Sequence, residues 1–123
     1  MARILILDEY QTIRDLLAEE LAGEGHIVTS VGKPESVPKE VITSNPDLAI
    51  LDLFIRGKYE WELLEQIRAL EPDLPILIYS GYYPAGDPHL YQIDGFVKKS
   101  CFFDELKRWI TGILMEPGLV ASM

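Results

Sequence analysis

The chain has 123 residues, of which 48% are hydrophobic, and its formal net charge is −9. This length supports one domain with an ordinary core and is too short for a second. Its 11 Lys and Arg residues are scattered along the sequence. That scatter argues against direct binding to nucleic acid, because phosphate neutralisation requires clustered positive charge.

Membrane insertion is not expected, because no apolar stretch approaches the ~20 residues that are needed to span a bilayer. The short apolar run near the N-terminus lacks the small-residue cleavage site of a signal peptide. The single cysteine, Cys101, cannot form an internal disulfide, which is consistent with a reducing compartment. We therefore expect a cytoplasmic protein.

The N-terminal part of the chain predicts two strands and two helices. Residues 3–7 form an apolar strand that ends at the acidic pair Asp8 and Glu9. Apolar residues then recur at helical spacing until a pair of glycines ends the pattern. These apolar positions are Ile13, Leu16, Leu17, Ala18 and Leu21. Residues 26–31 predict a more polar edge strand, and residues 34–44 predict a weak helix interrupted by a proline.

The middle of the chain repeats this alternation. Residues 48–51 predict a buried strand that ends at Asp52, and residues 61–70 predict a strongly amphipathic helix. A further apolar strand, residues 76–79, leads to Ser80. Each polar residue therefore comes directly after a strand.

The segment between Ser80 and Gly95 is poorly suited to a helix, because it contains Pro84 and Pro88. A proline inside a helix removes a hydrogen bond and clashes with the preceding turn, which costs ~3 kcal/mol or more. We expect at most a short helix here, around residues 87–92.

The C-terminal part predicts one more strand and one more helix. Residues 95–97 form the strand, which leads to Lys98 and Lys99. Residues 102–114 form an amphipathic helix, and a Pro-Gly break separates it from a loose tail over residues 117–123.

Successive β-α units predict an α/β fold in which helices cover both faces of a doubly wound parallel sheet. Ligands of such sheets bind outside the carboxyl ends of the strands, where the polar residues that follow the strands would surround one point. These residues are Asp8, Glu9, Asp52, Ser80, Lys98 and Lys99. Carboxylates bind Mg²⁺, whereas a hydroxyl and an ammonium group hold phosphate oxygens. The arrangement therefore favours chemistry with a divalent cation and a phosphoryl group.

Each of these residues also has an ordinary structural explanation. Asp8 would cap the following helix, Asp52 and Ser80 would open turns, and a lysine after a strand is usually solvated. A shared functional role is favoured because, without one, these polar residues would all have to occur at equivalent strand ends by chance. His26 and His89 do not suggest a metal site, and we expect both at the surface.

The arrangement resembles the receiver domain of two-component response regulators, such as the chemotaxis receivers, over residues 2 to about 115. Four segments carry the resemblance, namely ILILDE (4–9), LAILDL (48–53), LPILIYSG (74–81) and DGFVKK (94–99). It implies a five-stranded, flavodoxin-like (βα)5 sheet of order 2-1-3-4-5 with a shortened or disrupted fourth helix. We expect a receiver domain over residues 1–116 and a flexible C-terminal tail over residues 117–123.

The resemblance also implies roles for single residues. Asp52 matches the aspartate that accepts the phosphoryl group, Ser80 the hydroxyl residue that contacts it, and Lys99 the lysine that pairs with its charge. The magnesium ligands would be Asp8, Glu9, Asp52 and the backbone carbonyl of Phe54. Crowded carboxylates repel one another, and a divalent ion would neutralise them and polarise phosphorus for in-line attack.

In the family, phosphorylation changes a face that partner proteins read, and Ser80 and Phe96 match the hydroxyl and aromatic residues that move together. Because the fourth helix is disrupted here, we expect this face to be rebuilt, with Tyr82, Tyr83 and Tyr91 as an aromatic partner-binding surface. The alternative is that these tyrosines simply pack over the edge of the sheet.

Some positions depart from the family pattern. Ile55 and Arg56 replace the usual Met-Pro pair after the acceptor. Ser100 replaces the usual proline, so the Lys99–Ser100 peptide bond is expected to be trans, since a non-proline cis bond costs ~3 kcal/mol. Phe54 and Tyr82 are bulky and flank the path of attacking water in the family, so we expect slow hydrolysis of the phosphoryl group.

Such a domain implies a stand-alone phosphorelay signalling protein, not an enzyme, that receives its phosphoryl group from a histidine kinase or a phosphotransfer protein and contacts an unknown downstream target. The alternative is a degenerate receiver, a binding module that works without phosphorylation. A flavin-binding protein is disfavoured because residues 9–14 lack the small residues that cradle an FMN phosphate. An aspartate-nucleophile hydrolase is disfavoured because Phe54 replaces its second carboxylate.

Overall fold

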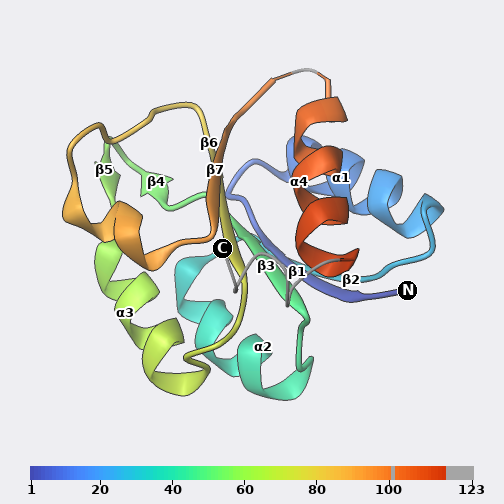
Figure 1. The fold of residues 1–123 in the computed structure, drawn as a ribbon, viewed down its shortest axis with the longest axis horizontal. Helices are drawn as coiled ribbons and strands as arrows, with labels where there is room; N and C mark the ends of the chain where they lie inside the picture. The colour runs from blue at the N-terminus through green and yellow to red at the C-terminus, as the bar shows by residue number, and fades with distance from the viewer. Residues whose placement is uncertain (101, 116–123) are drawn as a thin grey trace.

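The computed structural model describes residues 1–100 and 102–115. Its centre is a parallel five-stranded sheet of order β2-β1-β3-β6-β7 (Figure 1). The strands are β1 (Arg3–Leu7), β2 (Ile27–Val31), β3 (Leu48–Leu51), β6 (Ile76–Ser80) and β7 (Gly95–Lys98). When only the five strands of this sheet are numbered in chain order, their order is 2-1-3-4-5. This is the flavodoxin-like order, so the predicted fold is confirmed.

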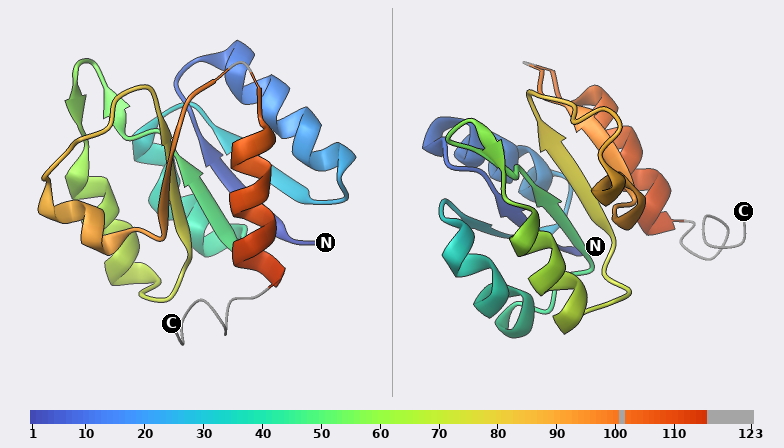
Figure 2. Two further views of the ribbon diagram at one scale, coloured as in Figure 1. Left: turned by 45° about the horizontal axis from the view of Figure 1, so that its top comes forward. Right: turned by 90° about the vertical axis from the view of Figure 1, so that its left-hand side faces the viewer.

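Helices cover both faces of the sheet, as the two views of Figure 2 show. The helices are α1 (Gln11–Gly23), α2 (Val37–Thr43), α3 (Trp61–Leu70) and α4 (Asp104–Met115). Alternate residues of β1 enter two separate cores: Ile4 and Ile6 pack with α1 and α4, whereas Leu5 and Leu7 pack with α2 and α3. A strand that is buried on both faces needs an unbroken apolar run, which explains the composition of β1 and β3.

A small hairpin follows β3 at the carboxyl edge of the sheet. It consists of β4 (Phe54–Ile55) and β5 (Lys58–Tyr59), which pair antiparallel. The two residues of its turn, Arg56 and Gly57, both have positive φ, 55° and 81°. Paired positive φ values are the geometry of tight hairpin turns, and the glycine adopts it without strain.

A short 3-10 helix, η2 (Pro88–Gln92), stands where a fourth helix was expected to be disrupted. Arg68 of α3 anchors its C-terminal end, because Nε and Nη2 donate to the Gln92 carbonyl at 3.0 and 2.7 Å. Arg68 Nη2 also lies 3.3 Å from the Asp94 carboxylate. The other 3-10 helix, η1 (Pro34–Ser36), precedes α2.

Two details of the helices differ from the prediction. The last helix begins at Asp104, and Phe102 lies before it with 73% of its surface exposed. The Phe102 amide donates to the Ser100 hydroxyl at 3.2 Å. On α1, Ile13 and Leu16 are 36% and 51% exposed instead of buried. The tail at 117–123 lies outside the described residues. Within residues 1–100 and 102–115, no helix is long and apolar enough to cross a bilayer.

Candidate functional site

The carboxyl edge of the sheet brings the predicted side chains together. β1 and β3 pair through Leu7 and Leu51, so the residues that follow them, Asp8 and Asp52, lie side by side. The Asp52 amide donates to the Leu7 carbonyl at 2.9 Å and continues this register beyond the strands. On the neighbouring pair of strands, the Lys99 amide donates to the carbonyl of Ser80 at 2.8 Å.

Lys99 joins the two buried aspartates. Its Nζ lies 2.7 Å from Asp8 Oδ2 and 2.6 Å from Asp52 Oδ2. The remaining carboxylate oxygens accept from backbone amides, Asp8 Oδ1 from Tyr10 at 2.9 Å and Asp52 Oδ1 from Phe54 at 3.0 Å. With side chains only 3% and 7% exposed, both carboxylates are fixed in place by these contacts.

The charge of Lys99 is stabilised by its partners. Burial alone would lower the pKa of the Lys99 ammonium, but hydrogen bonds to Asp52 and Asp8 and the negative charges of both carboxylates raise the pKa above its usual value. Lys99 is therefore a cation at neutral pH, next to two acidic groups.

Ser80 supplies an unsatisfied hydroxyl beside this pair. The residue is fully buried, and its Oγ has no hydrogen-bond partner among the described residues. The Tyr59 hydroxyl donates to the Tyr82 carbonyl, and the Ser80 side chain is near enough to the Tyr59 oxygen to oppose the rise of the Tyr59 pKa. A buried polar group without a partner costs about 1–3 kcal/mol, so Ser80 is positioned to bind an additional oxygen ligand.

The predicted magnesium ligands are only partly assembled. Asp8 and Asp52 are buried together, whereas Glu9 is exposed and Phe54 half-buried. Within residues 1–100 and 102–115, no three His, Cys, Asp or Glu side chains are gathered in a metal-binding cluster. Two buried carboxylates, an adjacent Glu and a carbonyl nevertheless form an all-oxygen set of the kind that Mg²⁺ prefers, so these residues fit the ion.

Tyr79 supports Lys99 from the preceding strand and was not predicted to do so. Its hydroxyl donates to the Ser100 carbonyl at 3.2 Å, and the Ser100 amide lies 3.4 Å from the same hydroxyl. The Lys99–Ser100 peptide bond is trans, as predicted. The only sequence signal for this role is that Tyr79 follows three aliphatic residues, Ile76, Leu77 and Ile78, and carries a polar hydroxyl.

Aromatic side chains form the other side of the site. The Phe54 ring lies 5.1 Å from the Tyr82 ring and 5.2 Å from the Tyr59 ring. Tyr83 packs edge-on against Phe96, with ring centroids 4.9 Å apart. Tyr82 and Tyr83 thus pack over the sheet edge and still remain 57% and 52% exposed. Tyr91, in η2, is 93% exposed.

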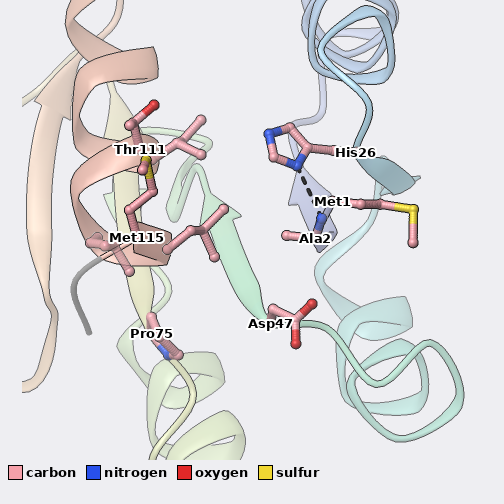
Figure 3. A pocket seen from close by; sticks show the side chains of 10 residues that line it. Met1, Ala2, His26, Asp47, Pro75, Thr111 and Met115 are labelled. Carbon is pink, nitrogen blue, oxygen red and sulfur yellow. Dashed lines mark hydrogen bonds between the residues drawn. The ribbon is translucent and has the colours of Figure 1, made fainter. Parts of the chain in front are cut away.

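A cavity of about 560 Å³ lies at the opposite edge of the sheet, as Figure 3 shows. Its lining includes Ala2, Asp47 and Pro75, which precede β1, β3 and β6, so it is separated from the acidic residues by the length of the strands. His26, at its wall, is half-buried and accepts from the Ala2 amide through Nδ1 at 3.2 Å. This cavity contains none of the predicted site residues.

The model of the response regulator receiver domain family matches residues 4–111 of the chain. The chain belongs to this family. The match begins within β1 and ends within α4, so it includes all the strands that carry the site residues. The predicted family is therefore confirmed, and receiver domains are signalling domains rather than classical enzymes.

Solved structures support the same assignment. The receiver is similar to the response regulator TrrA from Thermotoga maritima, solved in complex with Mg²⁺-BeF, with 34% identity, a TM-score of 0.83, and coverage of 92% of this chain and 99% of that one. A second structure of TrrA, in complex with the histidine kinase ThkA, matches with 34% identity, a TM-score of 0.82, and coverage of 93% and 99%.

Among curated proteins, the two-component response regulator PhoP from Pseudomonas aeruginosa is 26% identical over 98% of this chain and 55% of its own length. The chain covers between 16% and 64% of the length of the curated relatives that it matches. Five of these six relatives are longer proteins than this chain.

Proposed function

We propose that this receiver domain accepts a phosphoryl group on Asp52 and signals through contacts with other proteins. One observation carries the proposal: Lys99 Nζ lies within 2.7 Å of both buried aspartates, and the unsatisfied Ser80 hydroxyl lies at the end of the neighbouring strand. Such a cation and donor, next to a fixed carboxylate, suit the binding of phosphoryl oxygens.

The reaction is a displacement at phosphorus. A carboxylate oxygen of Asp52 forms the new bond to phosphorus while the bond from phosphorus to the donor breaks, and the leaving group keeps that electron pair. The donor is a phosphohistidine of a kinase or phosphotransfer protein, or a small acyl phosphate. Lys99 and Ser80 hold the phosphoryl oxygens during the transfer. The Phe54 amide keeps the carboxylate oriented through Asp52 Oδ1.

Magnesium would neutralise the carboxylates and the incoming phosphoryl charge. Its ligands in this proposal are Asp8, Glu9, Asp52 and the carbonyl of Phe54. The Mg²⁺-BeF complex of TrrA supports this assignment, since the sequences are 34% identical. Because Glu9 is exposed, its side chain would have to turn toward the two buried aspartates when the ion binds.

The proposed phosphodonor partner is a histidine kinase or a phosphotransfer protein in the cytoplasm. The complex of ThkA with TrrA supports a kinase partner. Here the exposed apolar residues Ile13 and Leu16 of α1, with Phe102 before α4, offer a contact surface next to the acceptor edge. With its positive charges scattered and a net charge of −9, the domain is proposed not to bind nucleic acid directly.

The proposed output surface is aromatic. Ser80 and Phe96 would respond to phosphorylation, and Tyr83 packs on Phe96 and so connects that response to the surface. Tyr82, Tyr83 and Tyr91 would then contact the downstream protein. Unchanged partner binding after alanine substitution of Tyr82 and Tyr83 would rule out this surface.

A second candidate is a binding module that works without phosphorylation. It is favoured by the ion pairs of Lys99 with both aspartates. Because the Lys99 ammonium already neutralises part of the carboxylate charge, the folded domain does not require magnesium to hold the two acids together.

One experiment separates the two candidates. The domain is incubated with Mg²⁺ and acetyl phosphate, and its intact mass is compared with that of the Asp52→Asn variant. The proposal predicts one added phosphoryl group on the wild type, dependent on Mg²⁺, and none on Asp52→Asn. No added mass on the wild type would contradict the proposed phosphorylation and would favour the binding module that works without it.

A further inference from the structure

Three aromatic rings from three different elements form a continuous stack beside the acceptor site. The Tyr59 ring, at the end of β5, stacks on the Trp61 ring, at the start of α3, with centroids 4.5 Å apart and planes 7° apart. Trp61 in turn stacks on His89 of η2, at 4.6 Å and 5°. We call Tyr59, Trp61 and His89 the aromatic column. It connects the hairpin after the acceptor strand to the segment that replaces the fourth helix.

The far end of the column is fixed to η2. His89 Nδ1 lies 2.7 Å from Asp87 Oδ1, which also accepts from the His89 amide at 2.9 Å, and His89 Nε2 lies 3.5 Å from Glu65 of α3. His89 was expected to be an ordinary surface residue, but these contacts and Trp61 bury it in part. Arg68 holds the opposite end of η2, whereas the start of η2 contacts α3 through the stack of His89 on Trp61 and through Glu65.

The near end of the column reaches the acceptor site. The Tyr59 hydroxyl donates to the Tyr82 carbonyl, which follows β6. The Tyr59 ring lies 5.2 Å from the ring of Phe54, two residues beyond Asp52. Burial raises the pKa of the Tyr59 hydroxyl. The phenol therefore stays neutral at physiological pH and has one proton to donate, within the electrostatic reach of Asp52.

We propose that Tyr59 is a positioning residue that reports the state of Asp52 to η2 by exchanging the acceptor of its hydroxyl proton. The inference rests on the proposed phosphorylation of Asp52. A phosphoryl group places charged oxygens beside Tyr59, and a hydrogen bond to a charged acceptor is about twice as strong as one to a neutral carbonyl. The hydroxyl then leaves the Tyr82 carbonyl for a phosphoryl oxygen.

The exchange has two consequences for the surface. The loop that begins at Gly81 loses its hydrogen bond to the hairpin, which releases Tyr82 on the exposed side. The Tyr59 ring turns with its hydroxyl, and Trp61 and His89 follow because the rings are stacked face to face. The column thus supplies the rigid connection that a full fourth helix would otherwise provide.

The test compares amide chemical shifts with and without Mg²⁺ and beryllofluoride in the wild type, in Tyr59→Phe and in the control Tyr91→Phe. Tyr59→Phe keeps the stacked ring and loses only the hydroxyl, while Tyr91 is an exposed tyrosine of η2 outside the column. In the wild type and the control, we expect beryllofluoride-dependent shifts at Asp52, Ser80 and Lys99 and also at Tyr82 and His89.

In Tyr59→Phe, the shifts at Asp52 and Ser80 should persist and those at Tyr82 and His89 should be lost. The readout is the difference in chemical shift between samples with and without beryllofluoride. A purely structural role of the Tyr59 hydroxyl would alter both samples alike and would leave this difference at Tyr82 and His89. Undiminished shifts at His89 in Tyr59→Phe would overturn the inference and leave the proposed function intact. No shift at Asp52 in the wild type would overturn both.

Discussion

The carboxyl edge of this receiver has two halves that are built differently. The charged half consists of Asp8, Asp52 and Lys99, which directly follow β1, β3 and β7 of the one parallel sheet. The aromatic half consists of Phe54, Tyr82 and the aromatic column, which are held by ring contacts between a hairpin, a helix and a loop. The comparison teaches that a sheet edge can keep its charged centre while the surface that surrounds it is rebuilt.

Replacing Lys99 gives the largest expected effect, in the charged half. Lys99→Met leaves the Asp8 and Asp52 carboxylates buried without a cation, and we expect the free energy of unfolding to fall by about 3 kcal/mol. Urea denaturation measures this loss. Millimolar Mg²⁺ should restore more stability to Lys99→Met than to the wild type.

Lys98→Met is the matched control, because Lys98 is the exposed neighbour. A loss in Lys99→Met as small as in this control would show that the charged half does not depend on its cation.

The pH dependence of the stability of wild type and Lys99→Met sharpens the test. The pKa of Lys99 is raised above 10.5 in the folded state, so the folded protein keeps this proton at pH values where the unfolded chain loses it. The stability that Lys99 contributes is complete below pH 10.5 and is lost as the pH rises through the folded pKa. The difference in unfolding free energy between wild type and Lys99→Met should therefore be constant from about pH 7 to about pH 10 and should shrink only as the pH rises above 10.5. A difference that already shrinks near neutral pH would contradict the raised pKa.

Phe54 tests what the aromatic half does for the charged half. Its ring packs on Tyr59 and Tyr82 beside the acceptor and should keep water from the acyl phosphate. We expect slow loss of label from the wild type and loss about tenfold faster from Phe54→Ala, which corresponds to about 1.4 kcal/mol in the barrier.

Phe102→Ala, at an exposed phenylalanine outside the aromatic half, is the control and should keep the wild-type rate. Loss of label from the wild type within seconds would refute the protection by Phe54.

Ser80 gives the smallest expected effect on stability. Its Oγ is buried without a partner, so Ser80→Ala removes an unsatisfied group and should leave the free energy of unfolding unchanged or raise it by up to about 1 kcal/mol. Phosphorylation by acetyl phosphate should nevertheless become slower, because a donor to the phosphoryl oxygens is lost.

Ser30→Ala, on the exposed side of β2, should change neither property. Clear destabilisation by Ser80→Ala would mean that the hydroxyl has a structural partner in solution.

The sequence predicted the charged half better than the aromatic half, for physical reasons. Asp8 and Asp52 follow apolar runs that predict strands buried on both faces of a parallel sheet, so both were expected at its carboxyl edge. The strand order that places them side by side came from the resemblance to receiver domains. The stack of Trp61 on His89 joins residues far apart in the chain, and no periodicity marks it. The replacement of the fourth helix was predictable because proline excludes a regular helix, but its anchoring by Arg68 was not, since long side chains reach partners that local patterns do not specify.

The most direct test of the central claim locates the phosphoryl group. After incubation with Mg²⁺ and acetyl phosphate, the acyl phosphate is reduced with borohydride, and peptide mass spectrometry identifies the converted residue. The account predicts conversion of Asp52 alone, in the presence of Mg²⁺ only. Conversion of Asp8 or Glu9, or of no residue at all, would contradict it.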